Sequence, residues 1–259
     1  MPPLRLICFL FLLLPASAQA LTLRMCVDFN PHPPLVMSKG EGVVDRLVAA
    51  AAHEAGLTLV RYYAPVARCR EELRAGKVDA FPLTPYIDAL RPFLVFPMAA
   101  GKPDVLRSVS AVRQLVYRRQ GSLASWNGSV AAGLGMPVLV SFGSVLVTER
   151  LTASRVPFDD NGKSTAVNLT KLMARRGDLL VGYEHDVEAL LARPEFAGKV
   201  EALPIPFSDE ICYLTVTPAF YRANRAQVER MWDAIGRLRK QARAQALENS
   251  AQPAEAIKK

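Results

Sequence analysis

Strand-like and helix-like segments alternate along this chain, and the alternation occurs twice. Apolar residues at every second position or in short runs indicate strands, and Ala- or Leu-rich stretches that end at glycine indicate helices. The first series predicts a strand over 21–28, a helix over 43–55, a strand over 57–62, a helix over 67–75 and a strand over 78–81. This order is typical of α/β units with parallel strands and right-handed crossovers.

The second series repeats this rhythm, and a final strand and helix follow it. It predicts strands over 111–117, 128–132, 136–140 and 178–182, helices over 145–151, 164–173 and 186–192, then a strand over 211–216 and a helix over 224–247. We therefore predict two α/β lobes, with residues 21–112 and 212–259 in a discontinuous first lobe and residues 113–211 in the second. Ligands of open parallel sheets bind beyond the carboxyl ends of the strands, so the cleft between the lobes is the expected ligand site.

The first twenty residues have the pattern of a secretory signal peptide. Arg5 precedes an apolar run over 6–14, and the stretch closes on Ala18-Gln19-Ala20. This pattern predicts cleavage before Leu21 and a periplasmic protein, whereas the alternative is an uncleaved membrane anchor. The apolar run is too short to span a bilayer as a helix.

The chain is basic, but its charges do not form a nucleic-acid-binding pattern. It has 32 Lys and Arg against 24 Asp and Glu, a formal net charge of +8. The basic residues are scattered, and the densest run, over 222–243, alternates with apolar residues as in an amphipathic helix. We expect no nucleic-acid partner.

Three cysteines remain after the predicted cleavage, namely Cys26, Cys69 and Cys212. An oxidising compartment favours one disulfide and one free thiol. We favour Cys26–Cys69, on the first strand and at a helix start of the first lobe, although spacing alone does not fix the connectivity. The cysteines and the isolated histidines fit no zinc pattern, and we expect neither a metal nor another cofactor.

Several ordered motifs carry a resemblance to a known family. They are the strand and proline-rich turn over 25–35, the Gly-Val-Val-Asp helix start over 42–47, the L-x-x-G-x-x-D-A element over 73–80, and Arg91 followed by Phe96. In the second half, Phe142-Gly143-Ser144 and residues 172–178 add to the set. The chain resembles the extracellular solute-binding protein family 3, the amino-acid-type periplasmic binding proteins of ABC transporters. This resemblance implies the type II periplasmic-binding-protein fold, with two α/β lobes joined by two hinge strands.

The motifs depart from the family pattern at the ligand site. The family's Thr-x-x-Arg spacing is stretched, because Thr84 lies seven residues before Arg91. His32 stands where many members have an aromatic residue before the Pro-Pro pair, and Leu35 replaces the Phe after it. Tyr183 lies at or near the place of the aspartate that often meets an α-amino group. These departures weaken the inference that the ligand is an α-amino acid.

The candidate carboxylate-binding residues come from both predicted lobes. The resemblance makes Arg91 the carboxylate anchor, since a guanidinium offers two parallel donors, and the alternative is a surface arginine beside an apolar run. Thr84 follows the strand over 78–81 and offers a hydroxyl to the cleft, or is an ordinary turn residue before a proline. Gly143 and Ser144 precede a helix and could hold an anion with backbone amides, or cap the helix only.

Three further candidates complete the set, and two of them have a purely structural alternative. Phe29 covers an apolar part of the ligand or packs on its own lobe. Tyr183 donates a hydroxyl at the cleft. Glu184, with Asp186 beside it, pairs with a ligand cation or is favoured only by the dipole of the helix start.

We therefore predict a monomeric periplasmic binding protein that closes two lobes around a small polar, carboxylate-bearing solute and delivers it to an ABC permease. One alternative is a dehydratase-like enzyme on the same scaffold, for which Glu184 or Asp186 would supply the acid. The chain contains none of the nucleophile, zinc or phosphate-loop motifs that indicate other chemistry, and we predict no enzymatic activity. The other alternative is a ligand-sensing accessory receptor.

Overall fold

A computed structural model describes residues 21–30, 32–37 and 42–251, with side chains to residue 245. The predicted signal peptide over 1–20 lies outside the described residues. None of the described helices combines the length and apolar character that a bilayer crossing needs.

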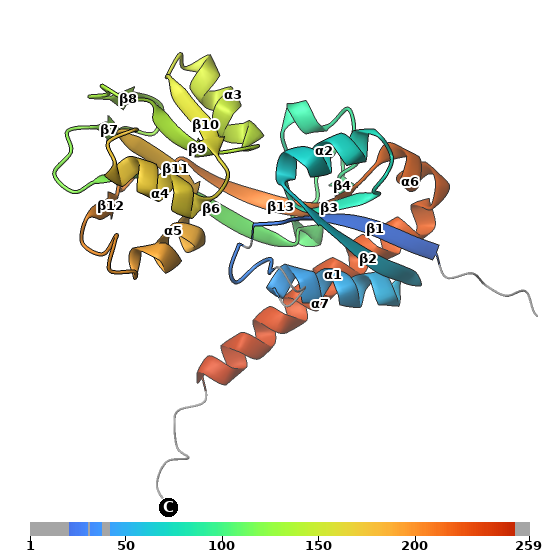
Figure 1. The fold of residues 1–259 in the computed structure, drawn as a ribbon. Helices are drawn as coiled ribbons and strands as arrows, with labels where there is room; N and C mark the ends of the chain where they lie inside the picture. Colours follow the sequence, from blue (N-terminus) through green and yellow to red (C-terminus); the bar gives the residue numbers. More distant parts are fainter. Residues whose placement is uncertain (1–20, 31, 38–41, 252–259) are drawn as a thin grey trace, which may run out of the picture.

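One large mixed sheet runs through the molecule, in the strand order β10-β9-β11-β6-β13-β3-β1-β2, and β12 adds to β6. Two long antiparallel strands, β6 (Ser110–Arg119) and β13 (Ser208–Val216), form its centre. Figure 1 shows these two strands running between two groups of strands and helices, which we call the first and the second half. The predicted lobe boundaries, at 112/113 and 211/212, fall within β6 and β13, and the division into lobes stays a prediction.

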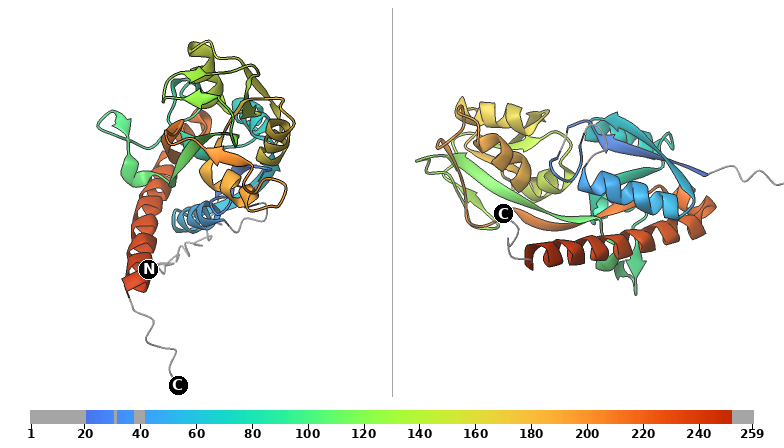
Figure 2. Two further views of the ribbon diagram at one scale, coloured as in Figure 1. Left: turned by 90° about the vertical axis from the view of Figure 1, so that its left-hand side faces the viewer. Right: turned by 90° about the horizontal axis from the view of Figure 1, so that it is seen from below.

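The first half contains parallel strands with helices on both faces. Residues Leu23, Met25 and Val27 of its central strand are fully buried, as the alternating pattern predicts. Its elements are β1 (Leu21–Asp28), β2 (Leu57–Ala64), β3 (Ala80–Pro85), α1 (Val43–Glu54), α2 (Val66–Arg74), α6 (Pro218–Ala223) and α7 (Arg225–Ala251). The long α7 lies beside α1, as Figure 2 shows, and buries Met231, Trp232 and Ile235 in the core.

The second half repeats the α/β arrangement around its own core. Its elements are β9 (Val138–Ser141), β10 (Phe158–Gly162), β11 (Leu179–Tyr183), β12 (Val200–Ala202), α3 (Val145–Ala153), α4 (Thr165–Met173) and α5 (Glu184–Leu191). Strands β9, β10 and β11 are parallel, and β11 pairs antiparallel with β6. Apolar residues on both faces of this sheet are buried, among them Leu139, Val140 and Leu180.

Short elements complete the chain. They are the hairpins β4 (Met98–Ala99) with β5 (Lys102–Pro103) and β7 (Ser125–Trp126) with β8 (Ala131–Ala132), and the 3-10 helices η1 (Asp88–Leu90) and η2 (Val105–Arg107).

Local signals end the helices where the sequence predicts. Gly56 and Gly76, just past α1 and α2, have φ angles of 76° and 67°, a region that glycine adopts without strain. At the start of α4, the Ser164 hydroxyl accepts a hydrogen bond from Val167 N (3.3 Å). Strands β10 and β12 and helix α6 were not predicted from the sequence.

The predicted disulfide is confirmed. Cys26 of β1 and Cys69 of α2 are joined, with their Cα atoms 5.6 Å apart. Cys212 of β13 is a buried free thiol. The disulfide therefore ties the first strand to α2.

Candidate functional site

A cavity of about 120 Å³ is lined by residues from both halves and from β6 and β13. Side chains at the ends of β1, β3 and β11 reach it, as do the first turns of α2, α3 and α5. Most of its wall is apolar, including Val66, Leu73, Leu90, Leu94, Leu146 and Val147. An enclosed apolar space with a few polar groups is typical of small-molecule sites.

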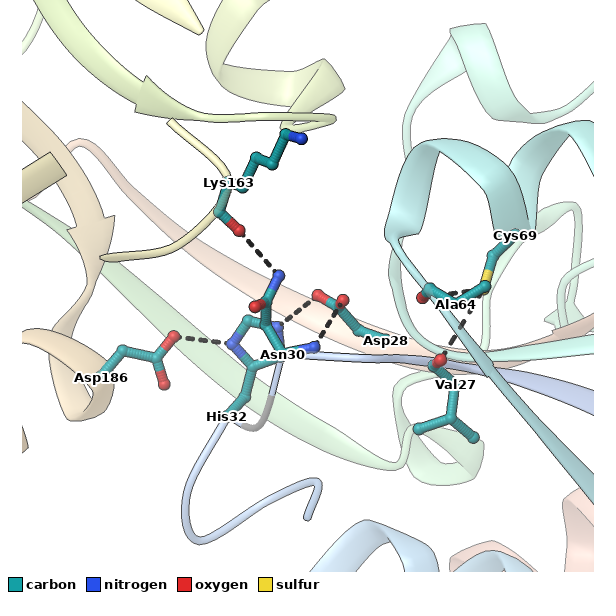
Figure 3. Close-up of polar contacts among 8 residues, drawn as sticks. All are labelled: Val27, Asp28, Asn30, His32, Ala64, Cys69, Lys163 and Asp186. Carbon is teal, nitrogen blue, oxygen red and sulfur yellow. Dashed lines mark hydrogen bonds and ion pairs between the residues drawn. The ribbon is translucent and has the colours of Figure 1, made fainter. Parts of the chain in front are cut away.

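His32 bridges the two halves at this cavity. Its Nδ1 donates to Asp186 Oδ2 of the second half (2.6 Å), and its Nε2 donates to Asp28 Oδ2 at the end of β1 (2.9 Å). Figure 3 shows the imidazole between the two carboxylates. Both ring nitrogens act as donors only in the charged imidazolium, so the cluster is an ion triad.

The protonation of His32 follows from these partners. Burial alone disfavours the charged ring, but the hydrogen bonds to Asp186 and Asp28 outweigh it and raise the pKa of His32 to about 10. Asp28 and Asp186 are both more than nine-tenths buried. The imidazole of His32 is therefore charged at neutral pH.

The proline-rich turn after β1 presents His32 to the second half. His32 N donates to Val36 O (2.9 Å), and Leu35 N donates back to His32 O (2.8 Å), which closes a tight turn. In the same segment, Asn30 Nδ2 donates to the carbonyl oxygen of Lys163 in the second half (2.9 Å), as Figure 3 shows. Both of these polar contacts between the halves come from the segment that follows β1.

Tyr183 and Asp186 lie at the junction of β11 and α5. The Tyr183 ring meets the His32 ring edge to face, with centroids 5.3 Å apart. Burial raises the pKa of Tyr183 above its ordinary value, so its hydroxyl stays neutral. Within the described part of the chain, Asp186 Oδ1 is buried without a hydrogen-bond partner.

The first turns of α2 and α3 meet at Gly143. A Cβ placed on Gly143 would lie 3.3 Å from Arg70 Nη2, 3.4 Å from Val66 Cβ and 3.5 Å from Ala67 N. Gly143 has a φ of 88°, and the closeness of α2 also leaves little room for a side chain. Arg70 lines the cavity, and among the described residues it makes no hydrogen bond or ion pair.

Four of the residues predicted from the sequence line the cavity, namely Thr84, Gly143, Ser144 and Tyr183. Thr84 is buried, and its hydroxyl donates to Phe81 O (3.3 Å) beside Thr215 Oγ1 (2.9 Å). The Ser144 hydroxyl makes no capping bond to α3. Their contact with a ligand stays a prediction.

The other three predicted residues do not line the cavity in this structure. The Arg91 side chain is 56% exposed, pairs with Asp88 (3.0 Å) and lies over the Tyr86 ring. Phe29 is 63% exposed, and Glu184 occupies the first turn of α5 outside the cavity wall. The structure brings Arg70, Asp28 and His32 to the cavity instead. Of these three residues, only His32 had a signal in the sequence, because it stands directly before the Pro-Pro pair.

The described residues hold no group of three His, Cys, Asp or Glu side chains placed to bind a metal ion.

The chain matches no protein-family model and no curated protein sequence. Solved structures resemble it over most of its length. The GluR0 ligand-binding core from Nostoc punctiforme in complex with L-glutamate is 16% identical, with a TM-score of 0.65, covering 88% of this chain and 98% of that one. A histidine kinase sensor domain with similarity to periplasmic binding proteins is 14% identical, with a TM-score of 0.67, covering 90% and 96%.

The substrate-binding protein of an amino acid ABC transporter is 15% identical, with a TM-score of 0.64, covering 88% of this chain and 98% of that one. At these identities the likeness concerns the fold. The chain therefore has the mixed α/β fold of type II periplasmic-binding-protein, or Venus flytrap, domains, as predicted.

Proposed function

We propose that this protein captures a small solute by closing two lobes around the cavity between its halves. The observation that carries the proposal is a cavity whose wall comes from both halves, together with the His32–Asp186 and Asn30–Lys163 bonds across it. These bonds exist only while the halves are together. A solute that touches both halves would favour that arrangement, because it gains its full set of contacts only there.

In this proposal β6 and β13 are the hinge strands, and the lobes are residues 21–112 with 212–259 and residues 113–211. The solute is small, polar and carboxylate-bearing. Thr84 of the first lobe contacts it first, and Ser144 and Tyr183 of the second lobe add contacts on closure. Arg91, Phe29 and Glu184, which lie outside the cavity wall here, would join only after a rearrangement.

For the wider role, we propose a monomeric periplasmic protein, exported by the signal peptide over 1–20, that delivers its solute to an ABC permease. Sensing is the second candidate, since a sensor domain of a histidine kinase has a similar fold. A cell-based uptake assay separates the two: loss of uptake on gene deletion supports delivery, whereas loss of a transcriptional response alone supports sensing. Enzymatic turnover is the remaining alternative, and recovery of the bound solute unchanged would argue against it.

The binding function is tested with the mature chain and a library of amino acids, organic acids, opines and polyamines. A true ligand raises the melting temperature in proportion to the logarithm of its concentration above its dissociation constant. Small-angle scattering should show a more compact particle with the ligand than without it. A library without any stabilising compound, or binding with no change in scattering, would contradict capture by closure.

A further inference from the structure

Arg70 is the arginine of α2 that turns into the cavity, and it has no hydrogen-bond or ion-pair partner in the described part of the chain. Burial and the nearby Arg74 lower the pKa of Arg70, only partly offset by Glu71. Its neighbours Arg68 and Arg74 are engaged elsewhere, Arg68 with Glu72 (3.0 Å) and Arg74 over the Phe93 ring (4.2 Å). A half-buried cation without an anionic neighbour is less stable than a paired one, so this position favours an anion.

The N-termini of α2 and α3 lie next to each other beside the Arg70 guanidinium. The first backbone bonds that reach back from α2 and α3 are Cys69 N to Pro65 O and Thr148 N to Ser144 O, both 3.0 Å. Of the amides before them, Val145 N donates to Gly143 O (3.0 Å), and the others in each first turn have no intrahelical acceptor. Neither helix has a capping side chain or an acidic residue in its first turn. The positive ends of both helix dipoles thus meet beside the Arg70 guanidinium, at Gly143.

A second, independent observation concerns a buried carboxylate oxygen elsewhere on the wall. Asp186 is only 7% exposed, and its Oδ1 atom lacks a donor among the described residues although the residue lines the cavity. Glu210 of β13 adds a half-buried carboxyl to the wall, and burial raises its pKa. A buried acceptor without a partner is costly, so the occupant should carry a hydrogen-bond donor.

From this arrangement we infer that Arg70, with the amides at the starts of α2 and α3, binds the carboxylate of a small organic acid. The apolar wall takes the acid's hydrocarbon body, and a hydroxyl or ammonium group of the same molecule donates to Asp186. Because Arg70 belongs to the first half and α3 to the second, the carboxylate joins both halves. This inference rests on the proposed function and names its specificity-determining residue.

The test uses three acids with their primary amides: hexanoate, phenyllactate and L-leucine. These acids carry no donor, a hydroxyl and an ammonium group, respectively. Titration calorimetry on the mature wild-type protein should detect binding of phenyllactate or L-leucine, weaker binding of hexanoate, and none of the amides. In Arg70→Gln the affinity for the acids should fall at least tenfold, roughly the contribution of a charged hydrogen bond.

Arg68→Gln is the matched control, because it removes the same charge from the exposed side of α2, and it should leave the affinity within about twofold of wild type. Arg70→Lys, which keeps the charge, should restore part of the affinity. Since Arg70 has no hydrogen-bond or ion-pair partner among the residues that the structure describes, the melting temperature of Arg70→Gln without solute should not fall.

Equal binding of acids and amides, an unchanged affinity in Arg70→Gln, or a destabilised Arg70→Gln with normal affinity would overturn the inference. The same holds if none of the three acids binds the wild-type protein. In each of these cases binding and compaction by another library compound would still support capture by closure. Failure of the whole library is the result that removes the function itself.

Discussion

Two charged groups in the wall of the cavity differ in one respect. His32 is held between Asp28 and Asp186, so its charge is neutralised by the protein itself. Arg70 lies at the starts of α2 and α3, and no acidic side chain among the described residues pairs with it. Both cations are at least partly buried, but among the described residues only His32 has anionic partners.

The difference indicates two tasks. A paired buried ion whose partners come from both halves favours the closed arrangement with or without a ligand, and a ligand adds its own contacts to that preference. An unpaired cation is stabilised only when an anion arrives, so it favours the occupied state. Closure and recognition would thus depend on different residues of one cavity.

The largest effect should come from removing the disulfide between β1, which ends at Asp28, and α2, which carries Arg70. Cys26 lies two residues before Asp28, and Cys69 precedes Arg70. Replacing both cysteines by serine should lower the free energy of unfolding by about 4 kcal/mol, the usual range for a loop of this length. Chemical denaturation measures this loss, and a reductant should destabilise the wild-type protein but not the double variant. A wild-type protein that is insensitive to reductant would contradict the expectation.

The next effect concerns the paired group. Asp186→Ala leaves His32 with Asp28 alone and should make the closed arrangement about 3 kcal/mol less favourable. Small-angle scattering of the ligand-free protein should then report a larger radius of gyration. Glu188→Ala, an exposed change on the same helix, is the control. If both variants scatter like the wild type, the His32 bridge does not hold the halves.

A smaller effect is expected in the pH dependence of the melting temperature, which also depends on the ion pairs of His32. The pKa of His32 is raised from 6.5 to about 10 in the folded protein. Its stabilising contribution is therefore complete below pH 6.5 and is lost as the pH rises through about 10. The melting temperature of the wild type should fall more than that of His32→Gln between neutral and strongly alkaline pH. Parallel profiles of melting temperature against pH for the two proteins would show that the charge of His32 does not stabilise the fold.

The smallest effect is expected at Arg91. Because its side chain is exposed and pairs with Asp88 at the surface, Arg91→Ala should leave the free energy of unfolding almost unchanged. In this conformation it should also change the acid affinity far less than Arg70→Gln does. Calorimetry on the two variants side by side decides between the anchor implied by the family resemblance and the one on the cavity wall. A large loss in Arg91→Ala with none in Arg70→Gln would reverse the comparison.

Much of the fold was predictable from the sequence. The exceptions are a strand at the edge of the sheet and a short helix. Strand β1 and helices α1 and α2 follow from apolar spacing and from glycines at the helix ends. Strand β10, Phe-Asp-Asp-Asn-Gly, has no strand pattern of its own and forms by pairing with β9 at the sheet edge. Helix α6 is short, and the prediction began the closing helix only at residue 224, beyond it.

The candidate site was predictable only in part. Positions next to strand ends and helix starts, such as Thr84, Ser144 and Tyr183, are at the cavity because topology brings those ends together. Arg70 has no such local signal, since it is one of three arginines over 68–76 and only the rotation of α2 turns it inward.

The alternation of strands and helices, and with it the fold class, was determined by the sequence alone, because the periodicity of buried residues is a local property. The partner of each charge was decided by the tertiary structure. His32 and Asp186 are 154 residues apart in the chain, and their hydrogen bond exists because the sheet places the end of β1 opposite the start of α5. A pair of residues so far apart leaves no pattern in a single sequence. A single sequence likewise does not show that Arg70 lacks a partner among the described residues.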